Sequence, residues 1–197
     1  MSAALKLAAR PLEKIGSRVA NYGDSRWEAL YDTITIPAGA MTATPMRFFS
    51  IAIGGAKSKV HTNMTQSGIL PKPQTMKVYG LHAEAYVNDP ADVNALVELS
   101  QKAVLRFFIG TKDYLEQPLS AVTGGIYLAQ APAASTALMA CFGAPKSVGY
   151  RYPKDGFVEI TESESFGVEI VNYSTFTLHA ALDLRMFLDG IRKVDVR

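Results

Sequence analysis

The stretch LYDTITIPAG, residues 30–39, has the alternating pattern of a β-strand that runs into a turn. Side chains on a strand alternate between its two faces, so the even-numbered residues of this stretch share one face. These residues are Leu30, Asp32, Ile34 and Ile36. The proline and glycine that follow end the strand. The stretch therefore predicts a β-strand with one buried face.

Eight further segments have the same character, because each is short, rich in apolar residues and bounded by Gly, Pro or polar residues. They are residues 46–54, 76–87, 104–109, 125–129, 136–142, 157–161, 166–171 and 176–188. Only residues 90–100 interrupt them with a helical pattern, in which Pro90 suits a first turn. Many short strands without strand–helix alternation predict an all-β antiparallel sandwich or barrel with one short inserted helix.

The composition is that of one folded domain. With 48% hydrophobic and 19% charged residues, the 197-residue chain has enough apolar material for a packed core, which excludes a disordered chain. The single cysteine, Cys141, excludes an intrachain disulfide framework and any multi-cysteine metal site. We see neither a run of roughly 18 apolar residues nor the apolar core of a secretory signal. We therefore expect no membrane-spanning helix, and folding in a reducing cytoplasm.

Residues 1–20 differ from the rest of the chain in charge and in period. Within a total of +2, the first 18 residues hold four cations and one anion, which leaves a net charge of −1 for the remainder. The cations recur every four residues and so align on one helical face. They are Lys6, Arg10, Lys14 and Arg18. The cluster NYGD at residues 21–24 then breaks the pattern, so we predict a basic amphipathic arm over 1–20 and one domain over 21–197.

Two uses of this arm are open. Its cations could form the solvated face of a helix that docks on the body, or they could contact the phosphates of nucleic acid or lipid headgroups. Pro11 would interrupt the helix unless it lies in the first turn, so a start at Ser2 and a start near Arg10 are both compatible with the sequence.

Residues 57–74, KSKVHTNMTQSGILPKPQ, form a loop that is long for a compact domain. The two prolines favour an extended path over a surface, and the Thr, Asn and Gln side chains supply hydrogen bonds without adding charge. We predict that this loop contacts a neighbouring subunit. The candidate contact residues are Asn63, Leu70, Pro71, Pro73 and Gln74.

The sequence contains no recognisable catalytic or metal-binding constellation. The histidines, His61, His82 and His179, are scattered, without the His-x-His pair of a metal centre. Cys141 has apolar neighbours that are typical of a buried small hydrophobe. The run GGAKS at residues 54–58 lacks the spacing of a phosphate-binding loop, and the acidic stretch 155–169 lacks a calcium-loop pattern. We expect no catalytic residue, no metal, no cofactor and no enzymatic activity.

Two parts of the sequence resemble a known family. The first is TNM at residues 62–64 with GILPKPQ at residues 68–74, and the second is FFIGTKDY at residues 107–114 with PL at residues 118–119. Together with the closing run at residues 176–190, they resemble jelly-roll capsid proteins of tailless icosahedral bacteriophages, over residues 46–188. No residue role is carried over from that family.

The resemblance implies an eight-stranded antiparallel jelly roll that assembles into capsomers, sometimes above an internal membrane. The 177 residues beyond the arm suffice for one roll, whereas two fused rolls would need roughly 300. We therefore expect a single-jelly-roll capsid shell subunit that self-assembles into an icosahedral virion in the host cytoplasm. Its partners would be copies of itself and other capsid proteins. The arm would meet the genome, an internal membrane or adjacent subunits at the particle interior.

Three alternatives are open. The chain could be a minor virion protein, such as a vertex, spike-base or connector protein, which differs from a shell subunit in stoichiometry. It could be a carbohydrate-binding β-sandwich, which should expose aromatic residues on one face. The candidates for that face are Trp27, Tyr31, Tyr150 and Tyr152. A cupin-type enzyme is the third alternative and lacks its metal ligands in this sequence.

Overall fold

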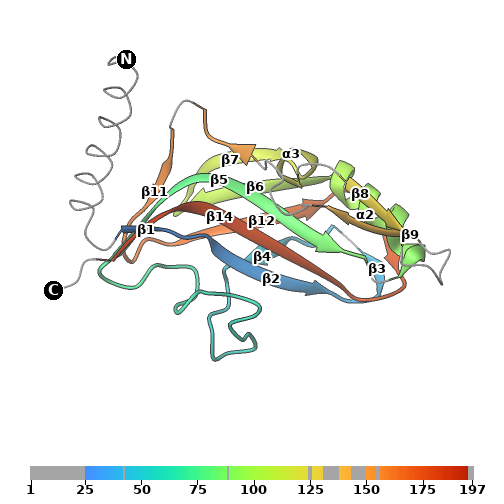
Figure 1. The fold of residues 1–197 in the computed structure, drawn as a ribbon, viewed down its shortest axis with the longest axis horizontal. Coiled ribbons are helices and arrows are strands. Elements are labelled where there is room, and N and C mark those ends of the chain that lie inside the picture. Colours follow the sequence, from blue (N-terminus) through green and yellow to red (C-terminus); the bar gives the residue numbers. More distant parts are fainter. Residues whose placement is uncertain are drawn as a thin grey trace, which may run out of the picture.

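The computed structural model describes residues 25–41, 43–87, 89–123, 126–130, 138–142, 150–153 and 156–194. Within these ranges the chain is mostly β-strand and every strand pair is antiparallel, which confirms the predicted all-β class. Two sheets lie one over the other in a sandwich-like arrangement (Figure 1). The predicted arm over residues 1–20, with its four cations, lies outside the described residues.

The larger sheet has eight strands, and its two longest strands lie at its centre. These are β5 (Gln74–Tyr86) and β14 (Leu182–Val194), which pair over almost their whole length. The other edge of β14 carries β1 (Ser25–Trp27) followed by β2 (Leu30–Ile36). The other edge of β5 carries β11 (Val158–Ile160), β10 (Tyr150–Arg151) and β9 (Leu138–Phe142), and β8 (Ile126–Gln130) pairs with β9. Short segments therefore follow one another along the two edges of a long central pair.

The smaller sheet has four strands in the order β4, β12, β6, β7. Their bounds are Met46–Phe48, Phe166–Asn172, Ala103–Ile109 and Lys112–Pro118. A separate two-stranded pair joins β3 (Gly39–Met41) to β13 (Phe176–Leu178). Strand β12 is distant in sequence from both of its neighbours, β4 and β6, whereas β6 and β7 are consecutive along the chain and pair with each other.

One apolar core forms where the inner faces of the sheets meet. Burial alternates along β6, where Leu105 and Phe107 are fully buried, and along β14, where Leu184 and Met186 are fully buried. Burying one such side chain stabilises the fold by roughly 1.5–3 kcal/mol relative to its exposure. The period-two pattern of the sequence therefore corresponds to the inner and outer faces of real sheets.

A β-bulge interrupts the pairing of the two central strands at Asp189 and Gly190. A Cβ atom on Gly190 would overlap with the backbone carbonyl of Lys77, so only glycine fits this close approach. The extra residue on β5 is Tyr79, which has no opposite partner in the ladder. The bulge shifts the register of β5 against β14 at the end of the sheet where β1 lies.

The predicted inserted helix is present. The 3-10 turn η1 (Pro90–Asp92) leads into α2 (Val93–Lys102), with Pro90 in the first turn and Leu96 and Leu99 buried. The Asp89 side chain caps the turn by accepting a hydrogen bond from the Ala91 N–H at 2.9 Å. A further helix, α3 (Ser120–Thr123), is too short to leave a periodic signal in the sequence.

Several predicted strands need correction. The segments 30–36, 104–109 and 166–171 match β2, β6 and β12 within one residue. The prediction for 46–54 is wrong beyond Phe48, because Phe49 adopts a φ of 64° and ends β4. The predicted strand 176–188 divides into β13 and β14, because the N–H groups of His179 and Ala180 turn to the Asp92 carboxylate. The predicted number of about eight strands is not confirmed, since the described residues contain fourteen strands, several of which are short segments that share one sheet position.

Candidate functional site

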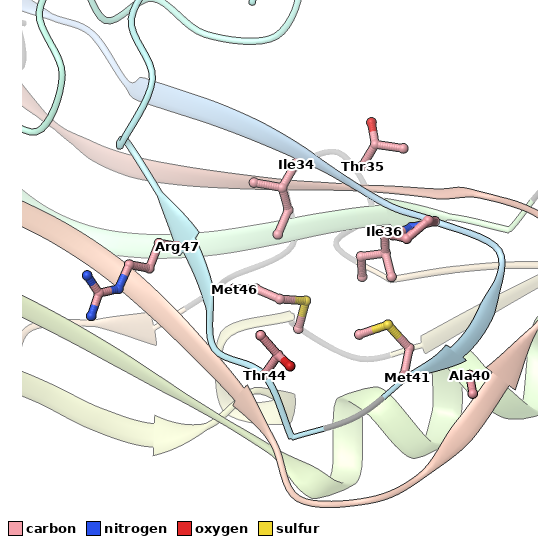
Figure 2. Close-up of a pocket in the computed structure, with 9 residues that line it drawn as sticks. Ile34, Thr35, Ile36, Ala40, Met41, Thr44, Met46 and Arg47 are labelled. Carbon is pink, nitrogen blue, oxygen red and sulfur yellow. The ribbon is translucent and has the colours of Figure 1, made fainter. Parts of the chain in front are cut away.

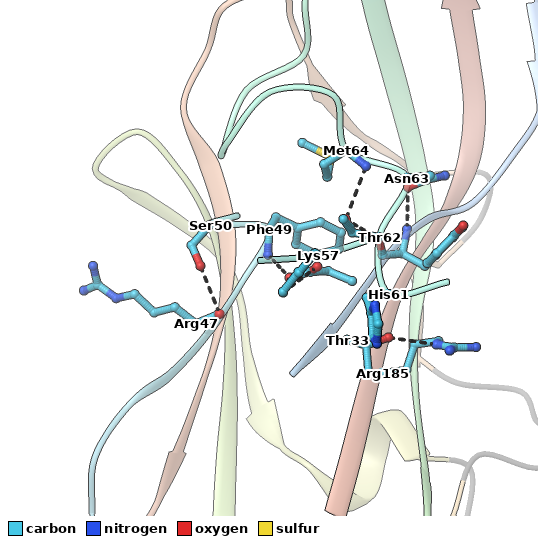
Figure 3. Close-up of polar contacts among 12 residues, drawn as sticks. Thr33, Arg47, Phe49, Ser50, Lys57, His61, Thr62, Asn63, Met64 and Arg185 are labelled. Carbon is cyan, nitrogen blue, oxygen red and sulfur yellow. Dashed lines mark hydrogen bonds and ion pairs between the residues drawn. The ribbon is translucent and has the colours of Figure 1, made fainter. Parts of the chain in front are cut away.

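The long connection between β4 and β5 is fastened to strand β2 by a buried ion pair. Asp32 is fully buried, and its carboxylate accepts hydrogen bonds from the Phe49 N–H at 2.6 Å and from the Lys57 ammonium at 2.7 Å (Figure 3). The Lys57 side chain is itself only 10% exposed. Two charges buried this deeply are stable only as a pair. Because Phe49 and Lys57 both contact Asp32, these interactions fix both ends of the segment 49–57 to strand β2.

Further along the same loop, backbone and side-chain groups cover the free edge of β2. The Thr33 N–H donates to the His61 carbonyl at 2.7 Å, and Asp32 and Thr62 form an isolated antiparallel bridge. The Asn63 amide accepts from the Tyr31 N–H at 3.0 Å and donates to the Ala29 carbonyl at 2.8 Å. An edge strand with unpaired N–H and C=O groups invites association with another chain. In this molecule its own loop occupies that edge.

The structure places the predicted inter-subunit residues at different depths. Asn63 is engaged by β2, and Leu70 is fully buried in the core of its own chain. Pro71 and Pro73 are half-buried, and the Gln74 side chain accepts a hydrogen bond from Arg192 at 3.1 Å. Asn63, Leu70 and Gln74 therefore make contacts within their own chain. Contact of the five residues with a neighbouring subunit stays a prediction.

The large apolar side chains that the connection between β4 and β5 exposes to solvent are not among these five residues. Val60 is 69% exposed, and Ile51 is also exposed. Val60 lies in the run KSKVHT, where a single aliphatic residue among charged and polar neighbours is the only sequence signal for it. If the loop contacts another subunit, Val60 and Ile51 are the side chains positioned to do so.

A pocket of about 420 Å³ opens between β2, β3 and β4 (Figure 2). Its lining is mostly apolar and comes from Ile34, Thr35, Ile36, Pro37, Ala40, Met41, Thr44, Met46 and Arg47. Arg47 is the one charged residue of the lining, and its guanidinium pairs with Glu169 at 3.0 Å. Unbranched methionines adapt easily to a partner's shape. The mostly apolar lining suits an apolar group.

An aromatic patch lies on the outer face of the larger sheet. The rings of Trp27 and Tyr79 stack with centroids 5.8 Å apart, and Phe157 packs against Tyr79 at 5.7 Å. Trp27 remains 62% exposed and Phe157 remains 42% exposed. The predicted aromatic set is corrected in part, since Trp27 has these partners, whereas Tyr31 packs on Phe187 and Tyr150 packs edge-on against Tyr152. Tyr79 and Phe157 are not members of the predicted set, and they meet Trp27 through the pairing of β1, β14, β5 and β11.

Each histidine ring contacts a polar side chain of the same chain, which gives each one a structural role. His82 pairs with Asp189 at 2.8 Å and stacks on Phe187, His61 contacts the Ser58 hydroxyl at 3.0 Å, and His179 contacts Asp92 at 3.0 Å. No group of three or more His, Cys, Asp or Glu residues that could hold a metal occurs among the described residues. Across the same ranges, no helix is long and apolar enough to cross a membrane.

Asp92 has a perturbed acidity with a clear cause. Burial raises the pKa of its carboxyl, but the N–H groups of His179 and Ala180 and the His179 ring together outweigh this, so the pKa lies below its ordinary 3.8. These contacts tie the start of α2 to the turn before β14. The carboxylate is therefore a structural anchor.

Comparison with protein-family models finds no match, and comparison with curated proteins finds none either. The case for a function rests on the geometry described above.

Proposed function

We propose that this chain is a capsid shell subunit built on a single jelly roll. One observation carries the proposal, namely the strand order of the two sheets. The larger sheet has the central order β2, β14, β5, β11, and the smaller has β4, β12, β6, β7. A jelly roll is a pair of such sheets in which two Greek keys distribute eight strand positions.

The connections support this assignment. The chain changes sheet six times, from β2 to β4, β4 to β5, β5 to β6, β7 to β8, β11 to β12 and β12 to β14, with β3 and β13 paired apart. Counting β1 with β2, and β8 to β11 as one group, gives eight positions along the chain. Each sheet therefore interleaves strands from the beginning, middle and end of the domain, which favours a rigid block with loops at its ends.

Such a block suits a shell because symmetric repetition multiplies weak contacts. The loop residues Val60 and Ile51 and the apolar pocket beside β4 give this chain surfaces for a second copy. The four cations of the arm, at about 1 kcal/mol each near an anionic surface, would attract phosphate weakly per copy. Many copies on one shell make that attraction collectively strong.

Electron microscopy of purified full-length protein tests the proposal. Closed shells, rings or regular arrays are expected, and a strictly monomeric protein at high concentration would refute it. A variant that lacks residues 1–20 should keep a folded body while its particles fail to close or fail to retain genome or lipid. Normal particles from that variant would refute the role of the arm. The mass fraction of the chain in a particle separates a shell subunit from a minor virion protein.

A carbohydrate-binding module is the second candidate, because the exposed aromatic patch of Trp27, Tyr79 and Phe157 resembles a stacking platform on a sheet face. Isothermal titration calorimetry of the protein and of its Trp27→Ala variant with soluble oligosaccharides tests for carbohydrate binding. Saturable binding that the substitution abolishes would favour this candidate over the shell.

A further inference from the structure

The chain's own loop covers only the first half of the free edge of β2, and the second half opens onto the pocket. The N–H groups of Tyr31 and Thr33 donate to the loop, whereas residues 34–36 line the pocket (Figure 2). Because N–H groups alternate in direction along an antiparallel strand, the Thr35 N–H points to the same open side as that of Thr33. No backbone acceptor for it is found among the described residues. An uncovered edge beside an apolar pocket favours association with another chain.

The lining of the pocket favours an uncharged guest. Ile34, Met41 and Met46 point into its volume of about 420 Å³, and all three pack against the core (Figure 2). Arg47 is the charged residue of the lining, but it points away from this space and pairs with Glu169 at 3.0 Å. The described lining residues therefore present no unpaired cation to the head group of a fatty acid or phospholipid. An aliphatic side chain from another protein chain fits this environment better.

An exposed aliphatic side chain lies beside the pocket without entering it. Val60 is 69% exposed, in the connection between β4 and β5 that projects beyond β2 (Figure 1). Its carbonyl accepts a hydrogen bond from Arg185 at 3.1 Å, and Arg185 lies opposite Thr33, the residue before the first pocket-lining residue of β2. Val60 is not a lining residue of the pocket in its own chain. An exposed apolar side chain and an open apolar pocket are therefore neighbours on one edge of the sandwich.

The charges beside Val60 and beside the pocket are opposite in sign. Lys59 is exposed, and it makes no ion pair with any residue that the structure describes. Asp183 is also exposed and lies opposite Thr35, whose hydroxyl donates to the Asp183 carboxylate at 2.6 Å. No cation lies within ion-pair distance of Asp183 in the same part of the chain. A cation beside the exposed side chain and a carboxylate beside the pocket complement each other between two copies.

We infer that two copies of this chain associate about a two-fold axis at this edge, with Val60 of each copy in the pocket of the other. Lys59 of each copy then faces Asp183 of the other, so the same contact forms twice. A two-fold interface requires a self-complementary surface of this kind, in which both halves of the contact lie on one patch. The inference rests on the proposed shell function, because it names one of the contacts between shell subunits.

Sedimentation equilibrium of the full-length protein tests the apolar half of the contact. Val60→Asp should weaken self-association by at least about tenfold, because it removes a buried aliphatic side chain and would bury a charge. Tyr173→Asp is the matched control, since Tyr173 is also 69% exposed but lies beyond the end of β12 in the smaller sheet. Equal association of the two variants would overturn the inference.

A second variant changes the pocket instead of its guest. Ala40→Phe fills the pocket from an exposed position, and it should weaken association as Val60→Asp does. Circular dichroism checks that each variant keeps the fold. Association of a folded Ala40→Phe variant at the strength of the unmodified protein would contradict the role of the pocket.

Charge reversal tests the polar half of the contact. Lys59→Glu and Asp183→Lys should each weaken association by about 2- to 30-fold, because two exposed ion pairs become repulsive. The double variant should recover the affinity, which a loss of local structure would not do. A double variant as weak as the single ones would overturn the pairing.

Zero-length carbodiimide cross-linking of an equal mixture of ¹⁵N-labelled and unlabelled protein identifies the partner directly. Mass spectrometry should find Lys59 joined to Asp183 in peptides of mixed label. If this cross-link occurred only in peptides of uniform label, it would lie within one chain and the inference would be wrong.

Other occupants of the pocket give different results. Dodecanoate that shifts the methyl NMR signals of Met41 and Met46 but leaves self-association unchanged would assign the pocket to an acyl chain and overturn the inference. A shift of those signals when residues 1–20 are deleted from the Val60→Asp variant would assign it to the arm, with the same consequence.

Electron microscopy separates this contact from the shell proposal. Normal particles from Val60→Asp would reject the contact and leave the shell proposal standing. A dimer that Val60→Asp dissociates, in a protein that never forms particles, would support the contact and reject the shell.

Discussion

Replacing Lys57 by methionine should destabilise this protein strongly, because it removes one member of a buried pair of charges. The Lys57 ammonium contacts both carboxylate oxygens of Asp32 at 2.7 Å, and Asp32 is fully buried. In Lys57→Met the carboxylate keeps only its hydrogen bond from the Phe49 N–H. Breaking a buried ion pair by removing one partner costs about 3–5 kcal/mol. The loss should appear as a lower free energy of unfolding.

The reasoning predicts that a second substitution recovers part of the loss. Asp32→Asn keeps an oxygen that can accept the Phe49 N–H, but it removes the negative charge. The double variant Asp32→Asn with Lys57→Met should therefore be more stable than Lys57→Met alone, by about 1–3 kcal/mol, since no uncompensated charge remains buried. The coupling in this cycle isolates the ion pair from the other contacts of the loop.

Urea denaturation followed by circular dichroism measures both effects as changes in unfolding free energy. Lys72→Met is the matched control, because Lys72 lies 3.9 Å from Glu162 and its side chain is 71% exposed. An exposed pair of this kind contributes about 0–1 kcal/mol. If Lys57→Met cost no more than Lys72→Met, or if the double variant were less stable than Lys57→Met, the buried pair would not be what fixes the loop.

Two further predictions concern the connections between elements. Asp92→Asn should cost about 1–3 kcal/mol at neutral pH. Because the pKa of Asp92 is lowered below 3.8, its stabilisation is complete above that value and is lost as the pH falls through the folded pKa, so the acid limb of the stability curve should flatten in the variant. An unchanged acid limb would contradict this assignment. Gly190→Ala should lower stability by about 1–3 kcal/mol or more, because its Cβ would overlap with the Lys77 carbonyl. Gly55→Ala, with ordinary contacts only, is the control for urea denaturation, and equal losses would contradict the close approach.

The candidate site was only partly accessible to sequence reasoning. The loop 57–74 was identifiable from its length and its prolines, but its polar residues serve the chain's own β2, as the paired amide of Asn63 illustrates. Trp27, Tyr79 and Phe157 are far apart in sequence, and they meet because β14 and β5 lie between β1 and β11. No local pattern encodes such a meeting, since it depends on which strands become neighbours.

The sequence by itself determined the elements whose signal is local. Period-two alternation specified β2, β6 and β12, and Pro90 with the apolar spacing after it specified the start of the inserted helix. Tertiary structure decided which strands pair and which charged side chains are buried, because both depend on residues that are distant in sequence. Asp32 falls on the buried face predicted for β2, but only Lys57 and the Phe49 N–H make a charge stable there. Strand β7 has an exposed, charged sequence and is a strand because β6 pairs with it. Periodicity reports which face a residue takes, whereas the pairing of strands and the burial of charge are set by segments that only the folded chain brings together.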